Sequence, residues 1–384
     1  MRRILLCLLA ILAATGCSTV SDTLGAMNPF ASSGPKMAEL TPIQPTVDTR
    51  IRWSTAIGKG GDYAFTPAVI GSSIYVAGQE GAIAKLEDGV AAWRVNAGQP
   101  LSAGVGSDGR IVVVGTAKGD VLAFSAADGK ALWQAKVSSE ILAPPAVSDD
   151  GVAVRSGDNR VFLLDRADGR RKWMYQRATP PLALRSTAAP VFAERYVFVG
   201  YPGGKLVALD LKNGAPVWEG AVALPKGATE LERVADIVSL PAIDGRQVCA
   251  VAYQGRVACF DLGQGGALIW ARDFSSAAGI ALDGRYLFLT DDKGAVHALD
   301  RSTGASVWKQ DKLLNRRVSG PVIRRGQVAV ADAQGIVHLL SREDGSFSAR
   351  VTTDGTRVVT PLQVFGTALL VQTSGGLVAA IDIQ

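Results

Sequence analysis

The sequence predicts an all-β protein, folded as an eight-bladed β-propeller with four-stranded antiparallel blades. Seven tryptophans recur at intervals of about 40 to 50 residues, at positions 53, 93, 133, 173, 218, 270 and 308. A turn such as Asp128-Gly129 or Asn213-Gly214 precedes most of them, which is typical of a β-hairpin. Two more short apolar runs lie upstream in each unit. Four short strands per unit of about 40 residues is the pattern of a propeller blade.

The eighth unit is marked by its turn rather than by a tryptophan. Asp344-Gly345 repeats the turn, but Ala349 stands where the tryptophan is expected. Conversely, Trp53 has no such turn before it, and the C-terminal run Leu377–Asp382 has no tryptophan after it. We therefore expect Thr49–Thr55 to form the outer strand of the last blade. This closure pairs the two chain ends and leaves no open sheet edge.

The N-terminus has the pattern of an export signal followed by a lipid anchor. Arg2 and Arg3 precede an apolar run of 11 residues, Ile4–Ala14, which is too short to span a bilayer. Small residues then lead to Cys17, as in a bacterial lipobox, although Ala14 stands where leucine is most common. We predict three regions: a signal peptide (1–16), a lipidated Cys17 with a flexible tether (17–47), and the propeller (48–384).

Composition excludes several classes of function. With 2 His and 4 Cys, the chain has little material for a histidine-based triad or a zinc site. From Cys17 onward it carries 38 basic and 35 acidic residues, scattered without a basic cluster, so no nucleic-acid partner is expected. No phosphate loop, nucleophile elbow or zinc-protease motif occurs. The tryptophans are expected to pack between blades, because one ligand does not need seven equivalent sites.

Two consecutive blade-to-blade connections are longer than the others, and we place the candidate binding site there. The first contains Leu182, Leu184 and Arg185, and the second contains Asp236. Equivalent connections leave a propeller on the same face, so these two loops are expected to be neighbours. Alternation puts Leu182 and Leu184 on one side of an extended segment, and acidic residues of the second loop are candidates to orient Arg185. The alternative places both leucines in the blade core and leaves the charges solvated.

Cys249 and Cys259 flank the turn Tyr253–Arg256. A two-residue turn sets Cys249 opposite Phe260, so the two sulfurs point to opposite faces of the sheet. We expect two buried free thiols.

The blade repeat, the lipobox and the two long loops together resemble one family. The Asp-x-x-x-Gly-x-x-x-Trp repeat is similar to that of pyrroloquinoline-quinone (PQQ) enzymes. Over the whole chain, the sequence resembles the BamB family of outer-membrane β-barrel assembly (BAM) lipoproteins. The more specific part of the match is Leu182–Arg185 with Ala189-Pro190, together with Ala228–Glu230 and Arg233–Asp236. One departure is Val238, where the family tends to have a second Asp.

The resemblance implies a non-catalytic scaffold that has no cofactor and lies at the periplasmic face of the outer membrane. Its implied partners are the POTRA domains of BamA and other BAM subunits, with unfolded outer-membrane proteins as clients. The implied BamA contacts are Leu182, Leu184, Arg185 and Asp236. Two alternatives remain: a PQQ-dependent quinoprotein dehydrogenase, and a lipoprotein that binds glycan or peptidoglycan. The dehydrogenase is disfavoured because no two cysteines are adjacent and few polar groups converge.

Overall fold

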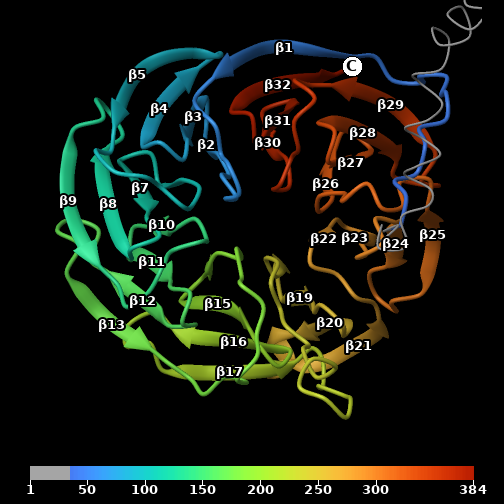
Figure 1. Cartoon of the computed structure of the whole chain (residues 1–384). Helices are drawn as coiled ribbons and strands as arrows, with labels where there is room; N and C mark the ends of the chain where they lie inside the picture. Colours follow the sequence, from blue (N-terminus) through green and yellow to red (C-terminus); the bar gives the residue numbers. More distant parts are fainter. Residues whose placement is uncertain (1–34) are drawn as a thin grey trace, which may run out of the picture. The chain divides into compact units, whose positions relative to one another are not determined.

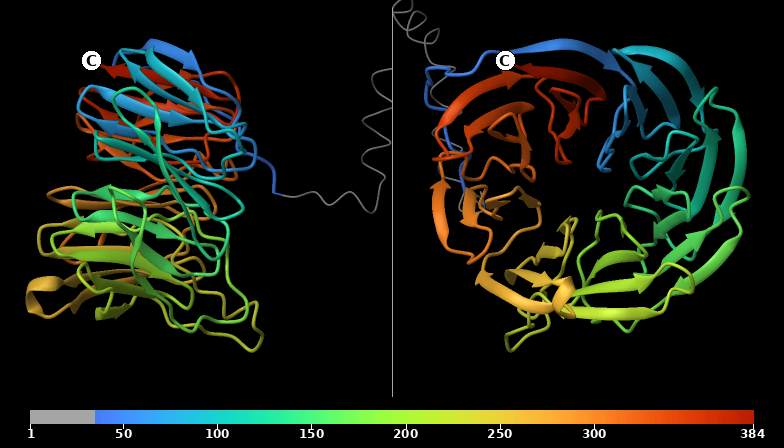
Figure 2. Two further views of the ribbon diagram at one scale, coloured as in Figure 1. Left: turned by 90° about the vertical axis from the view of Figure 1, so that its left-hand side faces the viewer. Right: turned by 180° about the vertical axis from the view of Figure 1, so that it is seen from behind.

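Eight four-stranded antiparallel sheets are arranged around a common axis (Figures 1 and 2). The structure is a computed structural model and describes residues 35–384. The predicted signal peptide and Cys17 lie outside the described residues. No helix within the described range is long and apolar enough to cross a membrane. The predicted eight-bladed propeller is confirmed.

The strands follow one another from the inside of each blade to its outer edge. Blade one consists of β2 (Ala68–Ile70), β3 (Ser73–Ala77), β4 (Ala82–Glu87) and β5 (Val90–Asn96), and blade two of β6 (Gly106–Ser107), β7 (Ile111–Gly115), β8 (Asp120–Ser125) and β9 (Ala131–Lys136). Blade three consists of β10 (Ala146–Ser148), β11 (Gly151–Arg155), β12 (Val161–Leu164) and β13 (Arg171–Tyr175). Blade four consists of β14 (Val191–Ala193), β15 (Tyr196–Tyr201), β16 (Lys205–Asp210) and β17 (Pro216–Ala221).

Blades five to seven are built in the same way, and blade five also carries a short 3-10 helix, η1 (Leu262–Gln264). Blade five consists of β18 (Ala242–Asp244), β19 (Gln247–Val251), β20 (Arg256–Asp261) and β21 (Ala267–Asp273). Blade six consists of β22 (Gly279–Leu282), β23 (Tyr286–Thr290), β24 (Val296–Asp300) and β25 (Ser306–Gln310). Blade seven consists of β26 (Val322–Arg324), β27 (Gln327–Ala331), β28 (Ile336–Ser341) and β29 (Phe347–Thr352).

The two ends of the chain close the ring in blade eight, as predicted. Its inner strands are β30 (Gln363–Phe365), β31 (Ala368–Gln372) and β32 (Leu377–Ile383), and its outer strand is β1 (Thr49–Ala56). β1 pairs antiparallel with β32 from Thr49 opposite Ile383 to Ala56 opposite Leu377. The first and last strands of the domain are therefore joined by a ladder of backbone hydrogen bonds.

The hydrophobic core is divided among the spaces between neighbouring blades. In one such cluster, Val113 and Ala123 of blade two pack with Val154 and Phe162 of blade three. The second and third strands of a blade read as nearly continuous apolar runs because both of their faces are covered. The outer strands alternate, since one of their faces is open to solvent.

Each tryptophan packs on the turn glycine of the next blade. Trp133 donates its indole N–H to the backbone oxygen of Arg166 at 2.9 Å. A Cβ atom added at Gly169 would lie 2.5 Å from the ring of Trp133, so only glycine fits there; its φ of +74° also favours glycine. The structural role expected for the tryptophans is thus what the structure shows.

The absence of a tryptophan at position 349 follows from the closure of the ring. The partner of a tryptophan there would be the turn between the third and fourth strands of blade eight. No such turn joins β32 to β1, because β1 precedes all the other strands in the chain. Gln384 instead donates its backbone N–H to the oxygen of Asp48 at 2.9 Å. Val47 packs against the cluster that contains Ala349.

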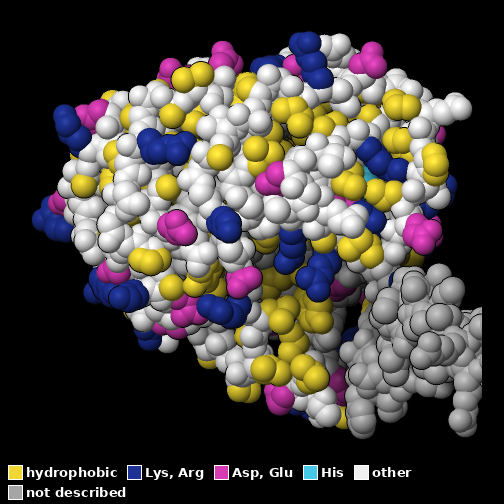
Figure 3. All heavy atoms as spheres, turned by 45° about the horizontal axis from the view of Figure 1, so that its top comes forward, with side chains coloured by type: hydrophobic (Ala, Val, Ile, Leu, Met, Phe, Trp, Pro, Cys, Tyr) yellow, Lys and Arg dark blue, Asp and Glu magenta, His cyan; other side chains and the backbone are white. Residues whose placement is uncertain are grey.

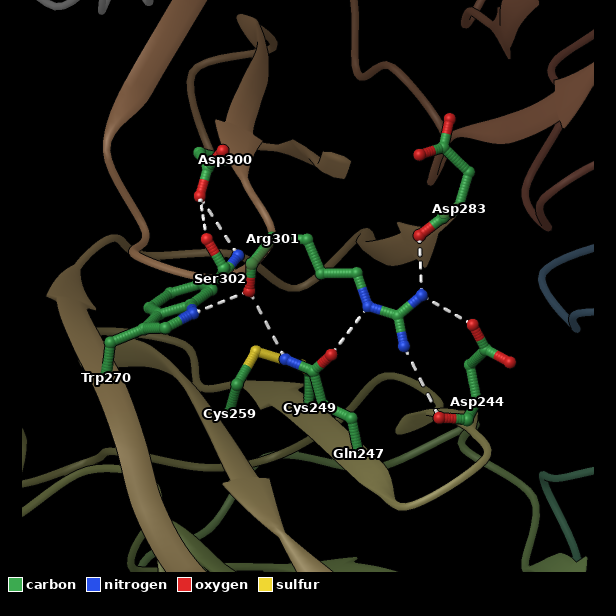
Figure 4. Close-up of a disulfide and its surroundings, with 9 residues drawn as sticks. All are labelled: Asp244, Gln247, Cys249, Cys259, Trp270, Asp283, Asp300, Arg301 and Ser302. Carbon is green, nitrogen blue, oxygen red and sulfur yellow. Dashed lines mark hydrogen bonds and ion pairs between the residues drawn. A yellow bond between two sulfur atoms is a disulfide. The ribbon is translucent and has the colours of Figure 1, made fainter. Parts of the chain in front are cut away.

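Cys249 and Cys259 form a disulfide, so the expectation of two free thiols is wrong. Four residues, 252–255, separate β19 from β20, and this connection sets Cys249 directly opposite Cys259. A shift of one residue in register moves a side chain to the other face of a sheet. Both cysteines are fully buried, as expected. Figure 4 shows the surroundings of the two cysteines, with Arg301 reaching from blade six to Gln247 and Asp244 of blade five.

Replacing both cysteines with alanine is expected to lower the free energy of unfolding by about 2 to 3 kcal/mol, because the cross-link closes a short loop in the unfolded chain. Urea unfolding under non-reducing conditions measures the loss. Addition of reductant should destabilise the wild-type chain by a similar amount and leave the double variant unchanged. If Cys249 and Cys259 can both be alkylated in the unfolded protein without reductant, the disulfide is contradicted.

Candidate functional site

The two long connections lie side by side on one face of the propeller. The first (176–190) joins β13 to β14, and the second (222–241) joins β17 to β18. They meet at Asp236, which accepts a hydrogen bond from the backbone N–H of Leu184 at 2.7 Å. Figure 2 shows the second connection standing out from the ring. The two loops, hereafter the paired loops, are neighbours as expected.

The paired loops expose leucines to solvent. Leu182 is 43% exposed and Leu184 is 36% exposed, so neither belongs to the blade core. The second loop adds Leu224, Leu231 and Leu240, all exposed. Hydrophobic side chains gather at the lower centre of the face in Figure 3, with Lys and Arg side chains beside them. A group of exposed leucines on a rigid scaffold is typical of a protein-binding surface.

Asp236 is buried, with 1% of its surface exposed, so it does not lie on the surface where a partner contact was expected. Its two carboxylate oxygens accept the backbone N–H groups of Leu184 at 2.7 Å and of Gly203 at 3.0 Å. Its own backbone oxygen accepts the N–H of Tyr253 at 2.8 Å. These contacts join both loops to blades four and five. Asp236 thus positions Leu184 instead of presenting its own charge.

A buried arginine lies beneath the first loop. Arg155, at the end of β11, donates to the hydroxyl of Ser186 at 2.9 Å and to the side-chain oxygen of Asn159 at 2.8 Å. It lies over the ring of Tyr201 at 5.6 Å. Burial lowers the pKa of Arg155, and the nearby Tyr201 and Asp236 oppose that shift. The sequence carries no signal for this role, because the residues near Arg155 in the chain do not show that the first loop will cover it.

Arg185 is oriented by a residue of a different loop from the one expected. Its guanidinium contacts Glu140 at 3.2 Å, and 71% of its side chain remains exposed. A hydrogen bond from Ser139 lowers the pKa of Glu140, and Arg185 adds to that effect. The glutamates of the second loop are used locally: Glu232 accepts the N–H groups of Ala228 and Thr229, and Glu230 pairs with Arg233. Val238 is buried.

The described part of the chain shows no group of three or more His, Cys, Asp or Glu side chains placed to hold a metal ion. The paired loops offer instead exposed leucines, two exposed arginines, Arg185 and Arg233, and a carboxylate that holds the backbone of Leu184. This arrangement can bind an apolar groove with an acidic rim.

Comparison with known proteins decides the family. Residues 79–310, more than half of the chain, match the family model described as PQQ_2, outer membrane protein assembly factor BamB. The chain belongs to the BamB family. It is 43% identical over 371 residues to the outer membrane protein assembly factor BamB of Bordetella pertussis, an alignment that covers 96% of this chain and 94% of that protein. It is 40% identical to BamB of Burkholderia pseudomallei, with 96% and 95% covered.

Solved structures agree with this family. The crystal structure of BamB from Moraxella catarrhalis superposes with a TM-score of 0.82 at 29% identity, covering 87% of this chain and 100% of that one. A quinohemoprotein alcohol dehydrogenase from Comamonas testosteroni superposes with a TM-score of 0.68 at 13% identity, covering 87% and 76%. The second likeness shows a shared propeller fold alone.

Proposed function

We propose that this protein is a non-catalytic scaffold lipoprotein of the BAM complex. In this proposal it binds the POTRA domains of BamA and aids the folding and insertion of outer-membrane proteins, which are its clients. The observation that carries the proposal is the pair of adjacent long loops, which present Leu182, Leu184 and Arg185 on a rigid ring. Relatives at up to 43% identity are named as outer membrane protein assembly factors, which supports the same activity.

The proposed mechanism is recruitment through the paired loops. Leu182 and Leu184 enter an apolar groove of the partner, where their burial supplies most of the binding free energy. Arg185, held by Glu140, meets an acidic group at the rim of that groove. Asp236 fixes the loop backbone before binding, which reduces the entropy lost on association.

The proposed location is the periplasmic face of the outer membrane, with acyl chains on Cys17 as the anchor. The disulfide between Cys249 and Cys259 fits an oxidising compartment such as the periplasm. Mass spectrometry of the protein extracted from the membrane fraction is expected to find Cys17 as the N-terminal residue, carrying acyl chains. A mature N-terminus without acyl chains would contradict the anchor.

Photocrosslinking tests the interface. A photoreactive side chain at Arg185 is expected to capture a POTRA domain of BamA in cells. The matched control is Lys212, which is exposed in the turn between β16 and β17 on the opposite face. If position 185 captures no POTRA domain, or if position 212 captures it equally well, the assignment of the interface fails.

A further inference from the structure

The segment before β1 lies against the propeller, although it was expected to be part of a free tether. Ala38 donates its backbone N–H to the oxygen of Leu314 at 2.9 Å, and Thr46 donates to the oxygen of Ser348 at 2.9 Å. Leu40 packs against the cluster between blades six and seven, and Val47 packs against the next cluster. Residues 38–47, hereafter the strap, therefore run along the outer edge of blade seven.

Two arginines hold the strap by its backbone. Arg316 donates to the oxygen of Ala38 at 2.8 Å, and Arg350 donates to the oxygen of Thr41. Arg316 is itself 3% exposed and paired with the fully buried Asp332 at 2.7 Å. Asp332 also contacts His338, another fully buried side chain, at 3.0 Å. Arg316, Asp332 and His338 thus form a buried polar network, and this network positions Arg316 to bind a backbone oxygen of the strap.

The strap changes the character of the blade that it covers. The strands β5, β9 and β25 at the outer edges of other blades are mostly exposed. In β29, Ser348, Ala349 and Val351 are buried instead. This is also the blade whose repeat lacks the tryptophan, so the sequence of blade seven departs from the repeat where the strap passes.

The attachment point identifies a face of the ring. Leu314 and Arg316 belong to the connection between β25 and β26, which is a blade-to-blade connection like the paired loops. All such connections emerge on the same face of a propeller. The left view of Figure 2 agrees, because the blue N-terminal segment and the yellow-green loop after β17 both lie at the right-hand side of the ring.

We propose that the strap, clamped by Arg316 and Arg350, fixes the point at which the N-terminal segment leaves the propeller, on the face that bears the paired loops. Because the lipid anchor is attached to the propeller through this face, the face with the paired loops lies toward the membrane. The segment that covers the outer edge of blade seven is the strap, residues 38–47 of this same chain. The orientation rests on the proposed anchor at Cys17, whereas the clamp does not.

Hydrogen exchange of the full chain tests the clamp without lipid or partner. The amides of Ala38 and Thr46 are expected to be protected in the wild type and to exchange at least tenfold faster in Arg350→Ala. Arg246→Ala, which removes an exposed arginine of blade five, should leave both amides protected. Exchange at the rate of an unstructured peptide in the wild type, or unchanged exchange in both Arg350→Ala and Arg316→Ala, would overturn the clamp.

Fluorescence quenching tests the orientation. The lipidated chain is bound to vesicles that carry a nitroxide on the lipid headgroup, with a fluorescent side chain at Lys293 or at Ser302. Both residues are exposed in blade six, but Lys293 lies on the loop-bearing face and Ser302 on the opposite face. Stronger quenching at Lys293, by at least twofold, is expected. Equal or reversed quenching would overturn the orientation, whereas failure to bind vesicles would instead contradict the anchor and leave the exchange result standing.

Discussion

Replacing Asp236 with alanine is expected to weaken capture of the POTRA domains by about a hundredfold while the ring stays folded. The variant leaves the N–H groups of Leu184 and Gly203 without their acceptor. A hydrogen bond to a charged acceptor contributes about 1.5 to 3 kcal/mol, and a factor of one hundred in affinity corresponds to about 2.8 kcal/mol. Titration of the purified POTRA domains against both proteins measures the change.

The same variant separates a positioning role from a direct contact. If Asp236 acts by holding the loop, the Leu184 amide exchanges faster in Asp236→Ala even when no partner is present. Leu182→Ser is the matched control, because it removes an exposed contact without touching the carboxylate; it should weaken binding but leave the Leu184 amide protected. Lost binding in Asp236→Ala with full protection of Leu184 would refute the positioning role.

Replacing Asp332 with alanine is expected to lower the free energy of unfolding by about 3 to 5 kcal/mol, because Arg316 is left buried without its counter-ion. The carboxylate also accepts the backbone N–H groups of Gln334 and Ile336. Thermal and urea unfolding measure the loss. A decrease below 1 kcal/mol would show that water or another group solvates Arg316 in the folded protein.

The same cluster predicts a loss of stability in acid. Burial lowers the pKa of His338, so below pH 6.5 the unfolded chain binds a proton more readily than the folded chain does. The pKa of Asp332 is lowered to about 2, against burial, by His338, the N–H of Ile336 and Arg316. Its contribution, on the order of 2 kcal/mol, is present above pH 3.8 and is lost as the pH falls toward 2.

Unfolding at several pH values checks this prediction. His338→Gln should abolish the part of the acid-induced loss that begins near pH 6.5 and keep the part below pH 4. If the wild type and the variant have the same pH dependence between 5 and 7, His338 is not a source of the loss.

The repeat made most of the fold predictable. Each tryptophan packs on the turn glycine of the next blade. Because this contact is repeated between neighbouring blades, tryptophan and glycine recur at regular positions in the sequence and mark the blades. The same contact explains why Ala349 stands in place of a tryptophan: in blade eight no turn joins the third and fourth strands, so a tryptophan there would have no turn glycine to contact. The long loops were also visible as excess length, because a repeat makes every insertion measurable.

The amino-acid sequence by itself determined the eight blades, the closure by β1 and the position of the paired loops. Only the tertiary structure decided which face each side chain takes: the register that joins Cys249 to Cys259, the burial of Asp236, the pairing of Arg185 with Glu140, and the docking of the strap on blade seven. The physical reason is that strand periodicity and turn chemistry act over a few residues. Register, burial and the choice of ionic partner depend instead on contacts between residues far apart in the chain, which no local pattern records.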